Sequence, residues 1–244
     1  MKKIIVALFS AILVLSGCGG RSSNEVTDTI RWFYATHAVL TTVNNDDINM
    51  LGGSRSNLIN RALQLSMLED WWGVTNREEA DETIEWLLSG GHNQRFIDEY
   101  YLYELETYTR EELLRELEGA DGWIEAFFIN LHETYEIFGD RAILGWDLSR
   151  ANSLFGWFYI AGLIEYEEAL DGMLMVSRII QENFNSWDEF WESYMRGFLW
   201  WNEEDPSDQA SEYQSRRRIY EDLKLAQDSP FLLDFNMDFE VDWR

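Results

Sequence analysis

The chain has 244 residues with 45 aspartates and glutamates against 19 lysines and arginines, a formal net charge of −26 at pH 7. A surface of that charge repels nucleic acid and anionic lipid headgroups, so we expect no nucleic-acid partner. Hydrophobic residues make up 46% of the chain and aromatic residues 15%. This content excludes an intrinsically disordered protein and is ample for a packed core.

The N-terminus has the composition of a secretory signal peptide. Two lysines precede the apolar run 4–15, and this run is shorter than the roughly 20 residues that a membrane-spanning helix needs. Small residues then lead to Cys18, and Leu15-Ser16-Gly17-Cys18 resembles the lipobox of bacterial lipoproteins. In those proteins a diacylglyceryl group is attached to the thiol, and cleavage leaves the cysteine as the new N-terminus. We therefore predict a lipoprotein signal peptide over residues 1–17.

Cys18 is the only cysteine of the sequence, so it has no partner for a disulfide. This favours lipidation, by palmitate or a related acyl chain, over an ordinary signal peptide that happens to carry a cysteine. Two or three acyl chains hold a protein firmly where one binds only marginally. Residues 18–24 would then tether the protein to the extracytoplasmic side of a membrane of the cell envelope. No Pro/Gly/Ser-rich linker follows, and we predict a single α-helical domain over residues 25–244.

Most of this domain shows helical periodicity, with apolar residues three and four positions apart. The expected inward stripes of the first long helices are Val26, Ile30, Phe33 and His37; Leu58, Ala62, Leu65 and Trp72; Ala80, Ile84, Leu87 and Leu88; Phe96, Ile97, Tyr100 and Tyr101; and Ile124, Phe127, Phe128, Leu131, Tyr135 and Phe138. Glycines after these stripes, at positions 73, 90, 91 and 139, predict the helix ends. Capping boxes are predicted at 75–78, 109–112 and 186–189, the second opening a short helix that ends at Gly119.

Residues 141–163 differ because they are apolar nearly all round, with Gly145, Ala151 and Gly156 as small spacers. A helix that is hydrophobic on every side is a buried central helix. Three further helices are expected to bury Ala169, Met173, Val176 and Ile180; Phe190, Tyr194, Phe198 and Trp201; and, between residues 207 and 226, Tyr213, Tyr220 and Leu223. We find no internal repeat and no strand–turn–strand pattern. The predicted fold class is therefore all-α, a compact multi-helix bundle.

The C-terminal segment 231–243 departs from the helical pattern. Apolar and polar residues alternate in it, the apolar ones being Phe231, Leu233, Phe235, Met237, Phe239, Val241 and Trp243. A period of two indicates extended chain, since an α-helix would scatter these residues round its circumference. The segment would then lie as a strap in a groove of its own domain, or add as a strand to a partner's sheet edge. We expect the strap, because a long exposed apolar row is an aggregation hazard.

Two stretches resemble the bacterial family known as domain of unknown function 1266. The first, 67–96, has the family's Trp-Gly turn, its Arg-Glu-Glu-Ala helix start and its Gly-His before a phenylalanine. The second, 145–200, is similar in its Trp-Asp-x-x-Arg-Ala helix, its Ala-Gly turn and its Ser-Trp-x-x-Phe helix. The chain departs from the family at Asn93, where members tend to carry arginine. The family has no established activity, so the resemblance implies a common fold and no mechanism.

Asp147 and Arg150 are a charged pair on the apolar stripe of the central helix. Both are expected to point into the protein, where charges must be paired or hydrogen-bonded. Our first interpretation is a structural salt bridge between positions i and i+3 that fixes the helix register. The second makes Asp147 an acid or base and Arg150 an anion clamp at the base of a pocket. His92 would enter that pocket from the Gly90-Gly91 loop.

The other chemistry-bearing residues point to less specific roles. His37 and His132 lie on or beside apolar stripes and are expected to be satisfied core or boundary histidines. The tryptophan and phenylalanine stripes are expected in the core, with a ligand cage as the second interpretation. No HExxH, paired ExxH, cysteine cluster, GxSxG, P-loop or GxGxxG occurs, so we predict neither a metal nor a cofactor. The basic run 216–218 is expected to balance its acidic neighbours, or else to contact phosphate or an acidic partner.

Two functions are consistent with this sequence. One is a lipid-anchored binding or interaction module of the cell envelope, with the membrane and a protein as partners. The other is an envelope hydrolase that uses His92, Asp147 and Arg150. The absence of nucleophile and metal motifs favours the binding module.

Overall fold

The computed structural model describes residues 26–241 and residue 243, so the predicted signal peptide, Cys18 and the tether lie outside the described residues. In this part of the chain the α-helices are α1 (Asp28–Ala35), α2 (Ala38–Val43), α3 (Leu58–Trp72), α4 (Arg77–Leu88), α5 (Gly91–Leu102), α6 (Arg110–Glu116), α7 (Gly122–Phe138), α8 (Leu144–Ala161), α9 (Tyr166–Asn183), α10 (Trp187–Asn202) and α11 (Glu212–Leu225). No strand occurs among these residues. The predicted all-α fold is confirmed.

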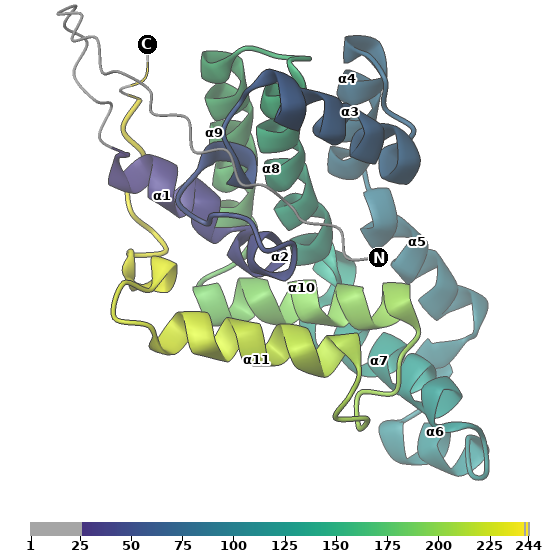
Figure 1. Cartoon of the computed structure of the whole chain (residues 1–244). Helices are drawn as coiled ribbons and strands as arrows, with labels where there is room; N and C mark the ends of the chain where they lie inside the picture. Colours follow the sequence, from purple (N-terminus) through teal and green to yellow (C-terminus); the bar gives the residue numbers. More distant parts are fainter. Residues whose placement is uncertain (1–25, 242, 244) are drawn as a thin grey trace, which may run out of the picture.

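Helix α8 is the centre of the bundle, as its all-round hydrophobicity predicts. Of its 18 residues 14 are buried, and it packs against α3, α4, α5, α9 and α10. Figure 1 shows α8 and α9 side by side, with α10 and α11 running across their lower ends. The small residues on α8 permit close approach of other backbone segments. A Cβ at Gly156 would lie 2.6 Å from the backbone nitrogen of Gly52, in the short 3₁₀ helix η1 (Leu51–Gly53).

The three predicted capping boxes have three different outcomes. At Thr109 the box is complete, because the hydroxyl accepts from the N–H of Glu112 and the Glu112 carboxylate accepts from the N–H of Thr109. At Ser186 only the hydroxyl caps α10. The box predicted at 75–78 is displaced by one residue, since α4 begins at Arg77. Asn76 is then the N-cap, and Glu79 rather than Glu78 receives the Thr75 N–H at 2.6 Å.

Several predicted inward residues face solvent instead. On α3 only Leu68 is buried, and Leu58, the first residue of the predicted stripe, is 86% exposed. A helix such as α3 has apolar residues on more than one face, and only its packing against other helices decides which face is buried. Trp201 at the end of α10 is 51% exposed, so it was wrongly assigned to the core. Tyr101, which helped to mark α5, is 48% exposed. His37 is buried as predicted, although it lies in the turn after α1 rather than on the helix.

The tail lies as a strap on its own domain, in the arrangement that we expected. It begins with a short 3₁₀ helix, η4 (Pro230–Leu232), and continues without regular structure along α1 (Figure 1). Phe235 and Trp243 are buried in it, whereas Val241 is 43% exposed. Rings of the strap contact Trp32 and Phe33 of α1 and Trp187 of α10, with centroids 4.9–5.9 Å apart.

Side chains of the bundle, rather than a neighbouring strand, satisfy the backbone of the strap. The Gln181 amide donates to the carbonyl oxygens of Phe235 and Met237, at 2.7 and 3.0 Å. The Thr29 hydroxyl accepts the N–H of Glu240 at 3.0 Å. Backbone groups held in this way are not available to a neighbouring strand. The strap is therefore an integral part of the domain.

Candidate functional site

The start of α5 is held against α8 by one carboxylate. Gly90, the N-cap of α5, has no side chain with which to accept the first backbone N–H groups of the helix. Asp147 of α8 supplies the missing acceptor, because its Oδ2 lies 2.8 Å from the backbone nitrogen of Asn93. The Asp147 side chain is fully buried, and it lies at the positive end of the α5 dipole. A residue 54 positions away in sequence therefore caps this helix.

The glycine pair before His92 makes this approach possible. Gly91 has a φ of +52°, and a Cβ there would lie 2.7 Å from Oδ2 of Asp147. Any side chain at this position would be strained in backbone conformation and would also displace the carboxylate. The sequence Gly90-Gly91-His92 thus fixes the imidazole beside α8 through backbone geometry.

His92 connects the carboxylate to the guanidinium. Its Nδ1 lies 2.6 Å from Oδ1 of Asp147, and its Nε2 lies 3.5 Å from Nη1 of Arg150. A guanidinium can only donate hydrogen bonds, so Nε2 is the acceptor in this arrangement. The geometry then fits the imidazole tautomer that carries its proton on Nδ1 and donates it to Asp147.

Arg150 does not pair directly with Asp147, so our first interpretation of the two residues was wrong. No ion pair between them occurs in the described part of the chain, because His92 and Asn93 occupy the carboxylate. The guanidinium lies instead against indole rings, 4.2 Å from the ring centroid of Trp146. The ring centroids of Trp72 and Trp201 lie 4.8 and 5.5 Å from the guanidinium carbon, distances typical of cation–π contacts. Burial lowers the pKa of Arg150 to about 10.

Two cavities meet at Arg150. Both are lined by Arg150, Trp71, Trp72 and Trp201. The first, which we call the His92 cleft, has a volume of about 470 Å³ and is also lined by Gly73, Glu79, Glu82, Thr83, Trp86 and His92. The second, which we call the Arg216 cavity, has a volume of about 540 Å³ and is also lined by Leu40, Val43, Asn44, Trp146, Trp157, Asn202, Glu212 and Arg216.

The rim of these cavities is rich in exposed indole rings. Trp71 is 67% exposed and Trp86 is 45% exposed, and the Trp86 ring meets the His92 imidazole edge to face at 4.7 Å. Exposed tryptophans gathered around a concave surface are typical of ligand-binding sites. The one hydroxyl among the described residues of the His92 cleft belongs to Thr83, and it donates to the backbone carbonyl of Glu79 at 2.7 Å.

A family model described as "Protein of unknown function (DUF1266)" matches residues 67–236, more than half of the chain. The chain belongs to this family. The match confirms the resemblance seen in 67–96 and 145–200, and it includes every residue of the His92 cleft. No curated protein and no solved structure matches the chain.

Asn93, where this DUF1266 chain departs from the usual arginine, has an internal role. Its Nδ2 donates to the carbonyl of Asp140 at 2.8 Å, and its Oδ1 accepts the N–H of Ile143 at 2.8 Å. The buried amide therefore joins the start of α5 to the turn that precedes α8. It contributes to the position of His92 and does not line either cavity.

The remaining histidines of the DUF1266 chain lie away from the cavities. His37 is buried, with Nδ1 2.9 Å from the Thr41 hydroxyl, and burial lowers its pKa to about 4. His132 Nε2 lies 2.8 Å from the carbonyl of Tyr108. Both are buried as expected, but they are only half satisfied, because His37 Nε2 and His132 Nδ1 have no hydrogen-bond partner among the described residues. In residues 26–241 and 243 we find no group of three His, Cys, Asp or Glu side chains that could hold a metal ion.

From the sequence, the aromatic half of the site was only the second interpretation. Trp72 and Trp201 were expected in the core, yet with the buried Trp146 they surround the Arg150 guanidinium. Arg216 was expected to balance acidic neighbours or else to contact phosphate or an acidic partner, and its side chain is only 12% exposed and lines a cavity. One signal was available: Trp71-Trp72 and Trp200-Trp201 are doubled tryptophans at helix ends. In each pair at least one ring is exposed, Trp71 to 67% and Trp201 to 51%.

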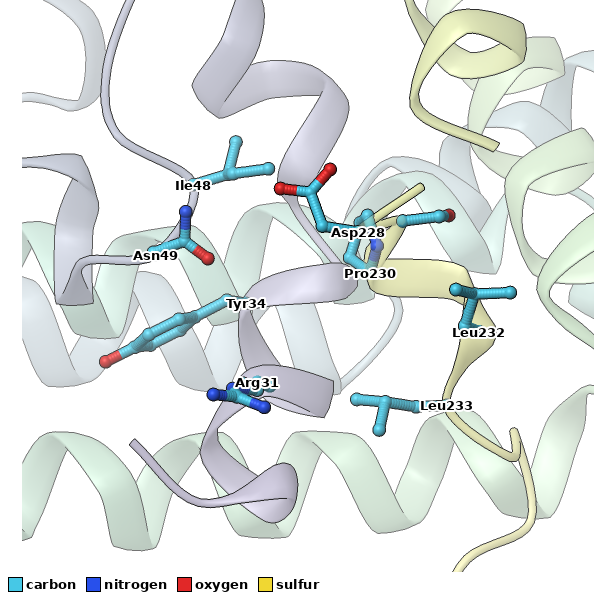
Figure 2. A pocket seen from close by; sticks show the side chains of 9 residues that line it. Arg31, Tyr34, Ile48, Asn49, Asp228, Pro230, Leu232 and Leu233 are labelled. Carbon is cyan, nitrogen blue, oxygen red and sulfur yellow. The ribbon is translucent and has the colours of Figure 1, made fainter. Parts of the chain in front are cut away.

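A third cavity lies at the opposite end of the molecule, between α1 and η4. It has a volume of about 450 Å³, and Figure 2 shows Arg31, Tyr34, Asn49 and Asp228 around it. The cation of this cavity, Arg31, already forms an ion pair with Asp28 at 3.3 Å. Its side chain is also 56% exposed to solvent. This cavity lacks the desolvated cation and the indole rings that distinguish the site at Arg150.

One structural observation concerns a possible membrane-spanning helix. Within the described residues, no helix is both long enough and apolar enough to span a bilayer.

Proposed function

We propose that this protein is a ligand-binding module of the cell envelope, tethered by lipid on Cys18, with its binding site at the His92 cleft. One observation supports the site above all others. The Arg150 guanidinium is covered by indole rings, forms no direct ion pair among the described residues, and lines the cleft. A desolvated cation is costly unless an acceptor reaches it. A ligand that offers hydrogen-bond acceptors would remove that cost on binding.

The binding test uses the full-length protein, purified in mild detergent. Small molecules that accompany the native protein are identified by native mass spectrometry, and the Arg150→Gln variant is analysed in parallel. We expect a bound molecule in the wild type and its loss in the variant. Arg31→Gln is the matched control, since Arg31 lines the cavity at the far end of the molecule. A ligand that survives Arg150→Gln would place binding elsewhere.

The lipid anchor is a separate part of the proposal and rests on the lipobox and the single cysteine. Cys18→Ser should release the protein from the membrane fraction or leave an uncleaved precursor, and it should abolish incorporation of labelled palmitate. Equal labelling of wild type and variant would contradict the anchor and leave the binding site untouched.

One observation favours a second function, an envelope hydrolase. The Asp147–His92 hydrogen bond of 2.6 Å orients an imidazole as the carboxylate of a catalytic triad does. We rank it second because Nε2 faces a guanidinium, and the one described hydroxyl of the cleft is engaged by backbone. Without a nucleophile, Nε2 would have to activate water. Hydrolysis of an ester or amide substrate that disappears in a folded His92→Gln variant would reverse this ranking.

A further inference from the structure

The Arg216 cavity brings together side chains from five helices. Its lining comes from the ends of α2, α3 and α10 and from the sides of α8 and α11. Arg150 enters it from α8 and Arg216 from α11. Its volume of about 540 Å³ lies within the range of roughly 300–1,000 Å³ that small-molecule sites occupy.

Positive charge is concentrated here in a protein that is otherwise strongly acidic. Burial lowers the pKa of Arg150 most, and the nearby charge of Arg216 lowers it further, while Tyr194 and the Asp147 carboxylate act in the opposite direction. Glu212 is the one carboxylate that lines the cavity, 3.2 Å from Nη1 of Arg216 and itself 67% exposed. The cavity therefore holds two cations and one anion. A negatively charged ligand would reduce the repulsion between the two guanidiniums.

The walls of the cavity are aromatic. Five of the twelve tryptophans of the chain line it, namely Trp71, Trp72, Trp146, Trp157 and Trp201. Indole faces favour flat ring systems, which they bind by offset stacking or edge-to-face contact. Asn44 and Asn202 add amide groups at the edge. Guanidinium groups in turn match the planar, bidentate geometry of a carboxylate better than that of other anions of one charge.

We propose that the Arg216 cavity binds a small aromatic carboxylate, with the carboxylate on Arg150 and Arg216 and the ring between the indoles. This inference deepens the proposed binding function and rests on it, because Arg150 belongs to both cavities. A neutral aromatic ligand would bring no anion to Arg150, which forms no direct ion pair among the described residues. An inorganic anion would leave the tryptophan walls without a partner. A cationic ligand would be repelled.

The test uses pairs of probes that differ only in charge. Benzoate, 2-naphthoate and indole-3-acetate are each titrated into full-length protein in detergent, alongside the corresponding amide and alongside inorganic phosphate. Binding is measured by isothermal calorimetry and by quenching of tryptophan fluorescence. We expect at least one acid to bind with a Kd below about 1 mM. Its amide should bind at least about tenfold more weakly, the effect of losing one charge-assisted hydrogen bond.

Three variants locate the bound acid. Arg216→Gln should weaken binding of the acid by about tenfold or more and leave binding of the amide unchanged. Arg218→Gln is the matched control on the same helix, because its guanidinium bonds the backbone carbonyl of Gln209 and does not line the cavity. Glu212→Gln should have the opposite effect on affinity. It removes the carboxylate that competes for Arg216, so it should tighten binding of the acid several-fold.

The outcomes separate this inference from the proposed function. Three results would overturn the inference. The acid and its amide could bind equally, no acid could bind at all, or the affinity for the acid could be unchanged by both Arg216→Gln and Glu212→Gln. A ligand lost in Arg150→Gln but unaffected by the α11 variants would overturn it and leave the binding function intact. Glu212→Gln guards against misfolding of Arg216→Gln, because Glu212 is exposed and its change is expected to improve affinity.

Discussion

The two ends of this bundle use aromatic side chains in opposite ways. At the strap, rings of α1, α10 and the tail contact one another, and Trp32 is completely buried between Phe235, Phe239 and Trp187. At the cleft, the rings of Trp72, Trp146 and Trp201 surround a guanidinium. The rim is open to solvent, with Trp71 67% and Trp201 51% exposed. Aromatic residues at the strap therefore stabilise the fold. Those at the cleft are available to a ligand.

Removing the strap should have the largest effect. Deletion of residues 230–244 takes several buried rings from α1 and α10, where the loss of one buried Phe or Trp side chain alone costs about 3–5 kcal/mol. We expect the truncated protein to unfold or to lose most of its stability, and to bind ANS strongly. Denaturation monitored by circular dichroism measures the change. A truncated protein that melts like the full chain yet loses a partner in pull-down would support strand addition instead.

Asp147, which holds His92 and the start of α5 in place beside the cleft, is a residue whose loss should affect the fold almost as much. Asp147→Ala leaves the His92 Nδ1–H and the Asn93 backbone N–H without their buried acceptor. Breaking a buried pair in this way costs about 3–5 kcal/mol. Asp147→Asn keeps one acceptor oxygen for Asn93 and should cost less. Urea denaturation distinguishes the variants. Unchanged stability of Asp147→Ala with loss of ligand would show that the carboxylate serves binding and not capping.

Acid should destabilise the fold partly through His37, which lies in neither region. Its pKa is about 4 in the folded protein and 6.5 in the unfolded chain, so the unfolded state binds more protons between these values. Stability therefore falls as pH drops from 6.5 towards 4, by up to about 3 kcal/mol from this residue. His37→Gln should flatten that part of the profile relative to wild type. If the stability of the two proteins falls by the same amount between pH 6.5 and 4, His37 does not contribute to the acid destabilisation.

The smallest effect on stability is expected at the rim of the cleft. Trp71→Ala removes a ring that is 67% exposed, so the free energy of unfolding should change by less than about 0.5 kcal/mol. Trp32→Ala, at the strap, is the matched comparison and should cost about 3–5 kcal/mol. Thermal melts of the two variants test the contrast directly. Similar losses in both would mean that the rim tryptophan is structural after all.

The doubled tryptophans show why the contrast between the two ends was only half visible in the sequence. Alternation along the tail predicted an extended chain with one buried face, and the aggregation hazard of an exposed apolar row favoured the strap over strand addition. In the structure the tail lies as a strap, although it starts with the 3₁₀ helix η4 and turns at residues 235–236 instead of extending throughout. The Trp71-Trp72 pair at the end of α3 offers no comparable pattern. Which of the two rings is buried depends on where α3 meets α8, and that contact is not encoded in the local pattern.

What the sequence by itself determined is local: the helical periods, the stop at Gly73, the complete cap at Thr109 and the buried character of α8. Each of these depends on residues within a few positions of one another, where backbone geometry fixes the spacing. The tertiary structure alone decided the partners of Asp147 and the surroundings of Arg150. Asp147 caps a helix that begins with two glycines 56 positions earlier, and Arg150 meets indoles from α3, α8 and α10. Such contacts arise from the packing of whole helices, because a carboxylate pairs with whichever donors the fold brings within hydrogen-bonding distance.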